Sequence, residues 1–228
     1  MKFTFGIITD GNANTNLNPI VDSIEKQNIP EYEILVVGNN SISRKNTKVI
    51  SFDESIKPKW ITRKNNLITL NSKYDNIVYT HDYIIFEDDW YDGYLKFGEN
   101  FKICMNKILN SDSSRYIDWV IWPHNKNFMD NIVLPNRECL IPYDMTHLSK
   151  YQYISGAYWV AKKDVMMEFP LDENLVWGQG DDVIWSRLVR KKYNFSINRF
   201  SSVKSLKLKE TPFNITTEET NKKLMKVE

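Results

Sequence analysis

The segment FTFGIITDGNANTNLNPIVDSIEKQNIPEYEILVVGN, residues 3–39, indicates the fold, because a strand pattern, a helix pattern and a second strand pattern follow one another in it. Residues 3–9 are an apolar run typical of a buried strand, and a turn rich in Gly and Asn follows. Asn18 with Pro19 makes a good helix start, and residues 31–39 are the second strand. The apolar residues of the helix keep its spacing: Leu17, Ile20, Val21 and Ile24. Such a unit predicts an α/β sheet with mostly parallel strands, covered by helices.

The alternation of strand and helix patterns continues through the first half of the chain. Residues 48–52 and 76–80 are predicted strands, and residues 57–74 between them are a predicted helix. We expect this helix to turn Trp60, Leu67 and Leu70 inward and to expose Arg63, Lys64 and Asn65 at its start. A long amphipathic helix is then predicted by apolar residues at intervals of three or four: Trp90, Tyr94, Phe97, Phe101, Met105 and Ile108.

The second half of the chain is less regular. Residues 118–123, 153–161 and 195–200 have strand patterns. The polar and aromatic stretch 124–152 exceeds ordinary loop length, and we interpret it as a loop that closes over a site. A last helix is predicted after Asp182, where two pairs at i,i+4 are expected to pack: Ile184 with Leu188 and Trp185 with Val189.

Composition excludes several classes of protein. A chain of 228 residues with 42% hydrophobic residues is long enough for one substantial core. Thirty basic and 29 acidic residues nearly cancel, which removes the broad positive field that nucleic-acid binding would use. There is no apolar run long enough for a membrane span, no signal-peptide pattern, and two cysteines without a zinc-binding cluster. These features predict a cytoplasmic protein with no nucleic-acid partner.

Polar residues recur where the predicted strands end, and ligands of parallel α/β sheets gather at that edge. Reading the strand ends in order gives the following residues: Thr9, Asp10, Gly38, Asn39, Asp53, His81 and Asp82. No Gly-x-Gly-x-x-Gly or Walker loop is present, so dinucleotide and P-loop sites lose their best support. An acid at a phosphate-binding edge makes sense mainly when Mg²⁺ or Mn²⁺ bridges the two, and Asp82 is the candidate metal ligand. Arg63 and Lys64 are candidates for contacts with the same phosphates.

Each of these assignments has a simpler alternative. Asp82 alone is about as often a loop acid that caps a turn. In EDDW (87–90), Asp88 or Asp89 precedes an apolar helix and is better explained as its N-cap. His124 and His147 in the long loop receive no metal role.

The pair Asp181 and Asp182 lies in WGQGDDVIWSRL (177–188), between a glycine-containing aromatic turn and a helix-periodic run. A helix start uses one side-chain acceptor at its N-cap, so one carboxylate is left over. With Asp182 assigned as the cap, Asp181 points into a cleft at the helix N-terminus, where the dipole favours its ionised form. The two roles can also be exchanged between these neighbours.

Three segments resemble the GT-A fold of nucleotide-sugar glycosyltransferases, especially family 2, over roughly residues 3–200. They are the opening GIITDGNANTNLNPIVDSIEKQNIPEYEILVVGN, the segment TRKNNLITLNSKYDNIVYTHDY, and YISGAYWVAKKDVMMEFPLDENLVWGQGDDVIWSRL. The chain departs from the family at three places. The usual Asp-x-Asp is Thr80-His81-Asp82, the acid common at the end of the second strand is Asn39, and around SSVKSL Lys204 occurs where some relatives have a histidine that binds the metal.

The resemblance implies an inverting glycosyltransferase that moves a sugar from a UDP- or GDP-sugar to a hydroxyl acceptor, carbohydrate or other, with Mn²⁺ or Mg²⁺. Asp181 would be the general base, paired with Asp182. It implies one domain over 1–206, with a nucleotide-sugar-binding half (1–90) and an acceptor half (91–206), and a charged tail at 207–228. The implied donor-binding residues are Thr9, Asp10, Asn39, Asp53, Arg63, Lys64, Asn65, His81 and Asp82. The implied acceptor-binding residues are Gly156, Trp177 and Gly178.

Two other functions stay open from the sequence. A nucleotidyltransferase on a related sheet is less favoured, because TDGNANTN after the first strand has no lysine or arginine. A non-catalytic carbohydrate-binding relative is suggested by the incomplete Asp-x-Asp. Trp177 can stack on an acceptor or belong to the core, and the residues favour neither reading.

Overall fold

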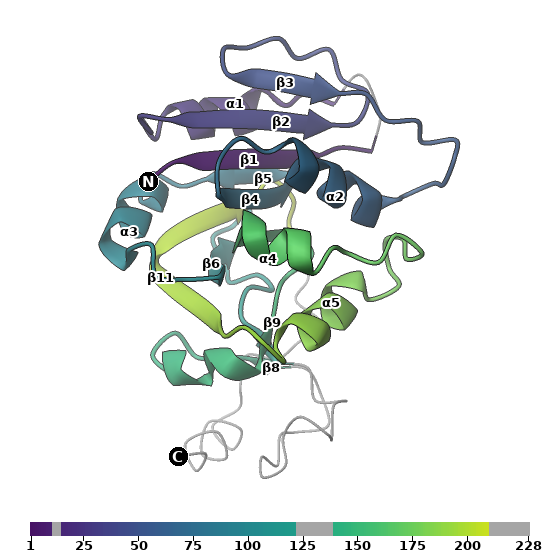
Figure 1. The fold of residues 1–228 in the computed structure, drawn as a ribbon. Helices are drawn as coiled ribbons and strands as arrows, with labels where there is room; N and C mark the ends of the chain where they lie inside the picture. The colour runs from purple at the N-terminus through teal and green to yellow at the C-terminus, as the bar shows by residue number, and fades with distance from the viewer. Residues whose placement is uncertain (11–14, 122–138, 210–228) are drawn as a thin grey trace.

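The computed structural model describes residues 1–10, 15–121 and 139–209, and its centre is a curled eight-stranded sheet with helices on both sides (Figure 1). The strand order is β3-β2-β1-β4-β10-β6-β11-β5. β1 (Phe3–Ile8), β2 (Tyr32–Val37), β3 (Thr47–Ile50) and β4 (Asn76–His81) run parallel. The order reverses between β1 and β4, which is the position where ligands of α/β sheets bind. The predicted α/β fold is therefore confirmed.

β1 is buried on both faces because the two helices of the first half lie on opposite sides of it. α1 (Asn18–Glu25) lies behind the sheet in Figure 1 and α2 (Ile61–Asn71) in front. On the α2 side, a Cβ at Gly6 would lie 2.3 Å from the side chain of Ile68, so glycine permits this close packing. On the other side, Phe5 packs edge-to-face on Phe86, with ring centroids 5.1 Å apart.

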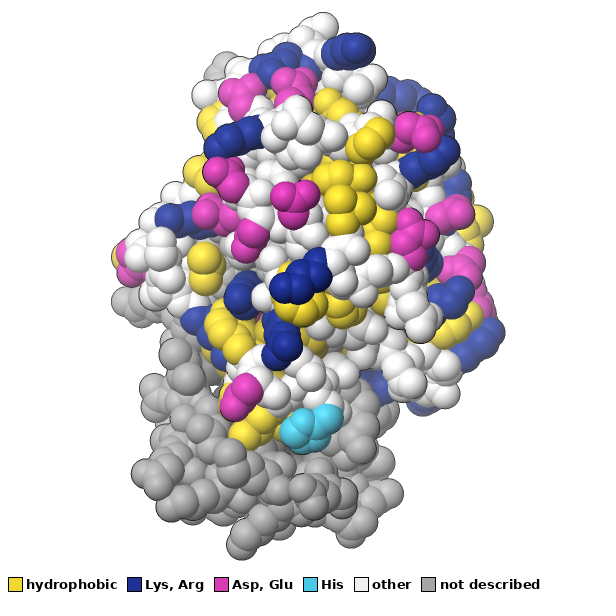
Figure 2. All heavy atoms as spheres, turned by 90° about the vertical axis from the view of Figure 1, so that its left-hand side faces the viewer, with side chains coloured by type: hydrophobic (Ala, Val, Ile, Leu, Met, Phe, Trp, Pro, Cys, Tyr) yellow, Lys and Arg dark blue, Asp and Glu magenta, His cyan; other side chains and the backbone are white. Residues whose placement is uncertain are grey.

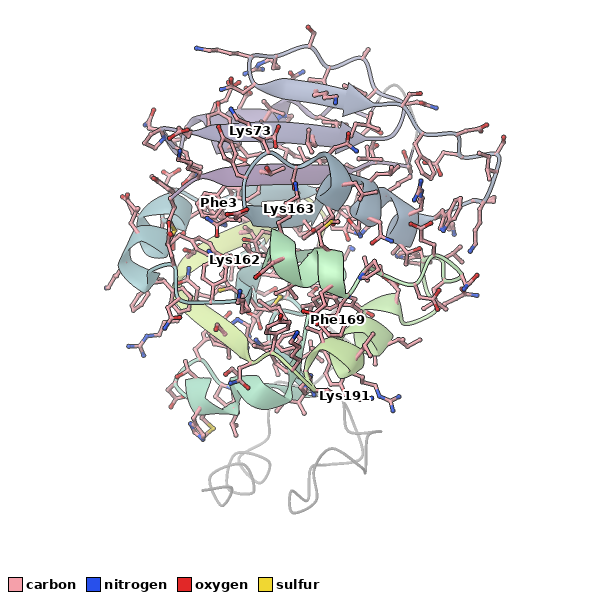
Figure 3. The ribbon with its side chains drawn as sticks, viewed as in Figure 1. Phe3, Lys73, Lys162, Lys163, Phe169 and Lys191 are labelled. Carbon is pink, nitrogen blue, oxygen red and sulfur yellow. The ribbon has the colours of Figure 1, made fainter. Side chains whose placement is uncertain are left out.

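The second half joins the sheet through the antiparallel pairing of β4 with β10 (Tyr158–Lys162). Two lysines at the junction of β10 and α4 (Lys163–Glu168) strengthen this connection (Figure 3). Lys162 Nζ donates to Asn76 Oδ1 at 2.7 Å, and Lys163 Nζ donates to the Ser72 carbonyl at 2.6 Å. The end of α2 and the start of β4 are thus fixed to a segment almost ninety residues later in the chain.

The other elements of the second half complete the sheet and add a small one. β5 (Ile84–Phe86) pairs with the end of β11 (Phe195–Ser205), which also pairs with β6 (Ile103–Leu109). A three-stranded sheet contains β7 (Val120–Ile121), β8 (Cys139–Leu140) and β9 (Gln152–Tyr153). The remaining helices are α3 (Trp90–Phe97), the 3₁₀ helix η2 (Thr146–Tyr151) and α5 (Asp181–Val189).

The predicted helix from Trp90 to Ile108 is wrong beyond Phe97. α3 ends at Gly98, which has φ +89°, and residues 103–109 form the strand β6. An apolar stripe at intervals of three or four also fits a strand that is buried on both faces, so the periodicity did not distinguish the two. Gly98 provides the left-handed backbone that ends the helix.

Two further helix predictions need correction. α2 begins at Ile61, and Lys64 and Asn65 are each only 2% exposed because the helix start is covered by residues 171–177. Leu70 is 55% exposed and does not face inward. In α5, Trp185 and Val189 are buried, whereas Ile184 and Leu188 lie at the surface.

The surface turned toward the viewer in Figure 2 carries acidic and basic side chains mixed together over α3 and β11. Within the described ranges, no helix is long and apolar enough to cross a bilayer. The predicted division into halves at residue 90 stays a prediction. Of the predicted tail, residues 207–209 are described and the rest lies outside the described residues.

Candidate functional site

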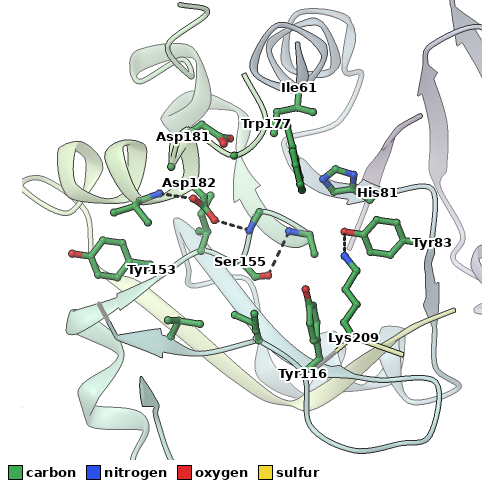
Figure 4. Close-up of a pocket in the computed structure, with 18 residues that line it drawn as sticks. Ile61, His81, Tyr83, Tyr116, Tyr153, Ser155, Trp177, Asp181, Asp182 and Lys209 are labelled. Atoms are coloured by element: carbon green, nitrogen blue, oxygen red, sulfur yellow. Dashed lines mark hydrogen bonds between the residues drawn. The ribbon is translucent and has the colours of Figure 1, made fainter. Parts of the chain in front are cut away.

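Two adjoining cavities lie at the carboxyl ends of the parallel strands. The first, which we call the Asp82 cavity, has a volume of about 280 Å³. The second, the Asp181 cavity, has a volume of about 340 Å³ and is drawn in Figure 4. Four residues line both cavities: Ile61, His81, Tyr83 and Trp177. Asp82 and Asp181, which are 99 residues apart in the chain, therefore line two adjoining cavities, and their convergence on one crevice that holds the donor stays a prediction.

Asp181 is the first residue of α5, and its side chain lines the Asp181 cavity although the residue is only 8% exposed. Burial, and then the charge of Asp182, raise the pKa of Asp181 from 3.8 to about 7, against the effect of nearby backbone N–H groups. We had expected the helix dipole to keep this carboxyl ionised. Burial and the neighbouring acid outweigh the dipole, so near neutral pH the group is present in both forms.

Asp182 is not the helix cap that the sequence predicts. The N-cap is Gly180, in a left-handed conformation with φ +72°, and Asp182 is the second helical residue. Asp182 Oδ2 accepts a hydrogen bond from the Gly156 N–H at 3.1 Å, and Oδ1 accepts one from the Val183 N–H at 2.8 Å (Figure 4). Burial raises the pKa of Asp182. This carboxylate therefore joins α5 to the turn before β10, and both Asp181 and Asp182 line the Asp181 cavity.

The two glycines predicted near the acceptor have different uses. A Cβ at Gly156 would lie 3.1 Å from Asp182 Oδ2, so this glycine leaves room for Asp182 as well as lining the Asp181 cavity. Gly178 also lines that cavity and has φ +85°, a backbone conformation that favours glycine.

Asp82 lines its cavity together with Thr9 and Asp10. Burial raises the pKa of Asp82, and the charge of Asp10 adds to this increase, whereas Thr9 and Lys207 lower the pKa. Of the strand-end residues predicted for the donor, Thr9, Asp10, His81 and Asp82 are thus brought together.

His81 forms part of the wall between the cavities and stacks on Tyr83, with ring centroids 5.2 Å apart. Burial, and then the charge of Lys209, lower the pKa of His81 to about 4. The imidazole is therefore neutral at physiological pH and adds no positive charge to the site.

The basic residues predicted for the phosphates are used differently. Lys64 lines the Asp82 cavity, but its ammonium group pairs with Glu54 and donates to the Thr9 carbonyl at 2.6 Å. Its charge is thus already balanced. Arg63 lines neither cavity and pairs with Glu173 at 3.0 Å, and Asn65 is buried within α2.

The start of α2 instead holds the loop that leads to Asp181. Trp60 Nε1 donates to the Glu173 carbonyl at 2.7 Å, and Thr62 Oγ1 donates to the Leu175 carbonyl at 2.8 Å. The Trp177 N–H donates to the Lys59 carbonyl at 3.1 Å. These bonds span more than a hundred residues of sequence and place Trp177 over both cavities.

Asn39 and Asp53 are structural in this conformation and line neither cavity. Asn39 Oδ1 accepts hydrogen bonds from Ser51 Oγ at 2.9 Å and from the Phe52 N–H at 3.3 Å, which ties the ends of β2 and β3 together. Asp53 Oδ1 accepts bonds from the Ser55 N–H and hydroxyl at 2.9 and 2.6 Å, as in an Asx turn.

Trp177 is 58% exposed, so the core-packing alternative is wrong for this residue. Lys59 Nζ lies 4.9 Å from the centre of its ring. Its role in acceptor binding stays a prediction. In the loop predicted to close over the site, His147 is exposed and lines neither cavity, and residues 122–138, with His124, lie outside the described residues.

The sequence analysis missed two lysines that follow β11. Lys207 lines the Asp82 cavity and Lys209 lines the Asp181 cavity, although we had assigned both to the tail. Lys204, which occurs where some relatives have a metal-binding histidine, donates to Ser113 Oγ at 2.9 Å and lines neither cavity. The signal was present in KLK, residues 207–209, because alternate residues of an extended segment point to the same side.

The sequence predicts that Asp88 or Asp89 caps α3 with its side chain, and this is wrong because α3 has no side-chain cap hydrogen bond. Asp89 is at the N-cap position of α3, but its carboxylate accepts hydrogen bonds from the Ser202 N–H and hydroxyl, at 3.0 and 2.7 Å, rather than capping the helix. Asp88 pairs with Lys26 at the surface.

The residues around Asp82 fit a divalent cation that is completed by a bound phosphate. Among the residues that the structure describes, no three His, Cys, Asp or Glu side chains gather into a ready ligand set. Mg²⁺, however, is commonly held by one or two carboxylates together with substrate phosphates. Asp10 raises the pKa of Asp82, and a cation between these two carboxylates would relieve their repulsion.

Comparison with known proteins finds no matching family model and no curated protein of similar sequence. Solved structures do match in fold. The crystal structure of S. aureus TarS gives a TM-score of 0.63 at 11% identity, covering 100% of this chain and 39% of TarS. S. aureus TarS 1–349 in complex with UDP-GlcNAc gives 0.59 at 12% identity, covering 100% and 65%. GalNAc-T7 with UDP, GalNAc and Mn²⁺ gives 0.61 at 12% identity, covering 99% and 47%.

This chain therefore spans less than two thirds of the length of these structures. They are glycosyltransferases of the GT-A fold, and the likeness confirms the fold that the sequence resemblance predicted.

Proposed function

We propose that this protein is a glycosyltransferase that moves a sugar from a nucleoside-diphosphate sugar to a hydroxyl group of an acceptor, with inversion at the anomeric carbon. The observation that carries the proposal is the pair of adjoining cavities, one with Asp82 and one with Asp181, that share four lining residues. UDP is the nucleotide we favour, because the structural neighbours include complexes with UDP and UDP-GlcNAc.

The Asp82 cavity suits the donor. It lies at the carboxyl ends of β1 and β4, beside the reversal of strand order, where nucleotides bind in open α/β sheets. A divalent cation held by Asp82 and Asp10 would supply positive charge to the donor diphosphate, and Lys207 in the same cavity adds to it. Mn²⁺ is favoured, since GalNAc-T7 was solved with UDP and Mn²⁺.

The Asp181 cavity suits the acceptor and the reacting bond. The acceptor hydroxyl oxygen attacks the anomeric carbon, and its proton passes to the Asp181 carboxylate. The bond between that carbon and the phosphate oxygen breaks, and the nucleoside diphosphate leaves with the electron pair. Because attack and departure occur on opposite faces of one carbon, the product is inverted.

The pKa of about 7 suits Asp181 to this role. A general base works best when its pKa is near the working pH, because it is then both ionised and basic enough to accept a proton. An ordinary carboxylate would be ionised but a much weaker base. Asp182 acts as a positioning residue, since its bond to the Gly156 N–H fixes the start of α5 against the cavity wall.

The proposal is tested with Asp181→Asn and, as a matched control, Asp164→Asn, whose carboxylate pairs with Lys102 on the surface. A panel of nucleotide sugars is first screened by thermal shift, with and without Mn²⁺, because a ligand of the native state raises the melting temperature. Release of the nucleoside diphosphate is then measured with the donors that bind.

We expect Asp181→Asn to lower the rates of sugar transfer and of donor hydrolysis by about 10²–10⁴-fold. The affinity for the nucleotide should stay within twofold of the wild type. Asp164→Asn keeps full activity. Wild-type protein that binds donors but never releases nucleotide would instead identify a non-catalytic sugar-nucleotide binder. Full activity of Asp181→Asn would remove the proposed base.

A further inference from the structure

The Asp181 cavity contains an ammonium group that the proposed reaction does not yet use. Lys209 is half-buried, and its backbone N–H donates to Asn110 Oδ1 at 3.1 Å, which fixes the segment after β11. Its Nζ donates to the Tyr83 hydroxyl at 2.8 Å and lies 3.9 Å from the centre of the Tyr83 ring. The Tyr116 ring is 5.5 Å away. Two aromatic rings and a phenol oxygen therefore hold this cation in place.

The ammonium group of Lys209 has no carboxylate at ion-pair distance among the described residues, and burial, then the charge of Lys207, lower its pKa against the opposing effect of Asp82. Among the residues that the structure describes, Lys209 forms no ion pair, whereas Lys64, Lys102 and Lys192 each pair with an acid. Aromatic faces attract a cation but do not cancel its charge. An ammonium group that is fixed in a partly dry cavity without a contacting carboxylate favours an anion as its ligand.

Lys209 and Asp181 lie on opposite sides of the cavity (Figure 4). Tyr83 and Tyr116 stand beside the lysine, and Trp177 and Asp182 are on the side of Asp181. Much of the remaining lining of this cavity is apolar or aromatic, and it includes Tyr116, Ile117, Val120, Tyr153, Ile154 and Val183. A ligand that fills this space therefore meets a proton acceptor at one end, an apolar wall in the middle and a cation at the other end.

We propose that the acceptor is a hydroxyl compound that carries an anionic group, a phosphate or a carboxylate, and that Lys209 binds this group while the reacting hydroxyl lies at Asp181. This assignment rests on the proposed function, because it divides the Asp181 cavity between the two ends of one acceptor. The apolar wall takes the carbon skeleton between them. Tyr83 is a positioning residue, since it orients the ammonium group without needing to touch the acceptor.

A second anion, the diphosphate of the donor, is also available as a ligand of the Lys209 ammonium group. The two cavities adjoin, so the experiment must separate the two sources. Occupying the Asp82 cavity with UDP and Mn²⁺ removes the donor as a ligand and leaves the acceptor end to be probed. sn-Glycerol 3-phosphate is the anionic probe and glycerol is its neutral partner.

The variants are Lys209→Met, which removes the charge, and Lys209→Arg, which keeps it. Lys204→Met is the matched control, because Lys204 lies on the same strand segment and donates to Ser113 away from both cavities. Affinities for UDP and for the two probes are measured by calorimetry, and circular dichroism confirms that each variant is folded.

We expect glycerol 3-phosphate to bind the UDP-saturated protein at least tenfold more tightly than glycerol does, and Lys209→Met to weaken that binding by about tenfold. Lys209→Arg restores most of the affinity, Lys204→Met leaves it unchanged, and the affinity for UDP stays within twofold in every variant. Equal binding of the two probes overturns the proposal. A loss of UDP affinity in Lys209→Met that matches the loss of probe affinity also overturns it, because the lysine would then serve the donor.

The two proposals can fail separately. Protein that binds no nucleotide, in any variant, contradicts the proposed function, and the phosphate probe can still be measured on it. Protein that binds and turns over a donor but shows no preference for the anionic probe keeps the proposed function and loses only the acceptor class.

Discussion

Replacing Asp181 by Asn should make the protein more stable at the same pH at which we expect the variant to lose the proposed transfer activity. The folded protein holds the pKa of Asp181 at about 7, against an ordinary value of 3.8. At 1.36 kcal/mol per unit, keeping this carboxyl ionised in the fold costs about 4 kcal/mol. Asn has the shape of the neutral acid and never ionises, so the variant avoids this cost.

The sign of the effect sets its pH dependence. The folded-state pKa is raised, so the folded protein binds this proton more tightly than the unfolded chain does. The penalty is absent below pH 3.8, grows as the pH rises to about 7, and is complete above that. The variant should therefore exceed the wild type by about 2–4 kcal/mol at pH 8 and by much less at pH 4.5, the lower figure allowing for relaxation around the charge.

The assay is urea unfolding of both proteins at pH 8 and pH 4.5, followed by fluorescence of the tryptophans and by circular dichroism. Asp164→Asn is the control, because its carboxyl lies on the surface in an ion pair and should change stability by less than 1 kcal/mol. A variant at position 181 that is no more stable than the wild type at pH 8, or whose advantage does not shrink at pH 4.5, would refute the reasoning from burial.

Four other outcomes follow from the same geometry. The rate of transfer should fall as the pH drops below about 7, by tenfold per pH unit, because Asp181 must be ionised to accept a proton. A rate that is constant from pH 5 to 8 contradicts this role. Gly180→Ala should cost about 1 kcal/mol of stability and most of the activity, since φ is +72° and ψ 33° at the N-cap of α5. Gly98→Ala, with φ +89° and ψ 176°, should cost more, about 1–3 kcal/mol in urea unfolding, and keep the transfer rate because Gly98 lines neither cavity. Lys64→Met should lower the free energy of unfolding by about 3 kcal/mol because Glu54 loses its partner, and the double variant with Glu54→Gln should recover part of this; additive losses would mean that the pair is not coupled. Trp177→Ala should change the free energy of unfolding by less than about 0.5 kcal/mol, as the residue is 58% exposed, and should raise the KM for the acceptor. A large loss of stability would mean that this ring packs in the core.

The parallel half of the sheet was predictable because its signals are local. The run of apolar residues in β1, the spacing of Ile20, Val21 and Ile24, and the turn residues between them each act within a few positions of the chain. Strand ends then follow from strand order, and this is why Thr9, Asp10 and Asp82 were found together.

The helix from Trp90 to Ile108 and the cap at Asp182 could not be decided in this way. An apolar spacing of three or four fits both a helix and a doubly buried strand, and the choice at β6 depends on its neighbours β10 and β11. The cap at Gly180 depends on Asp182 being drawn to the Gly156 N–H, a contact over 26 residues.

By itself, the sequence determined the α/β class and the order of its first elements, whereas the N-cap that it assigned to Asp182 is Gly180 in the structure. Only the tertiary structure decided which charges are free to act. Lys64 pairs with Glu54 and Arg63 pairs with Glu173, whereas Lys209, within the described part of the chain, contacts the Tyr83 ring and hydroxyl and forms no ion pair. The physical reason is that periodicity and turn chemistry act over a few residues, whereas burial and the pairing of charges depend on groups brought together from across the chain.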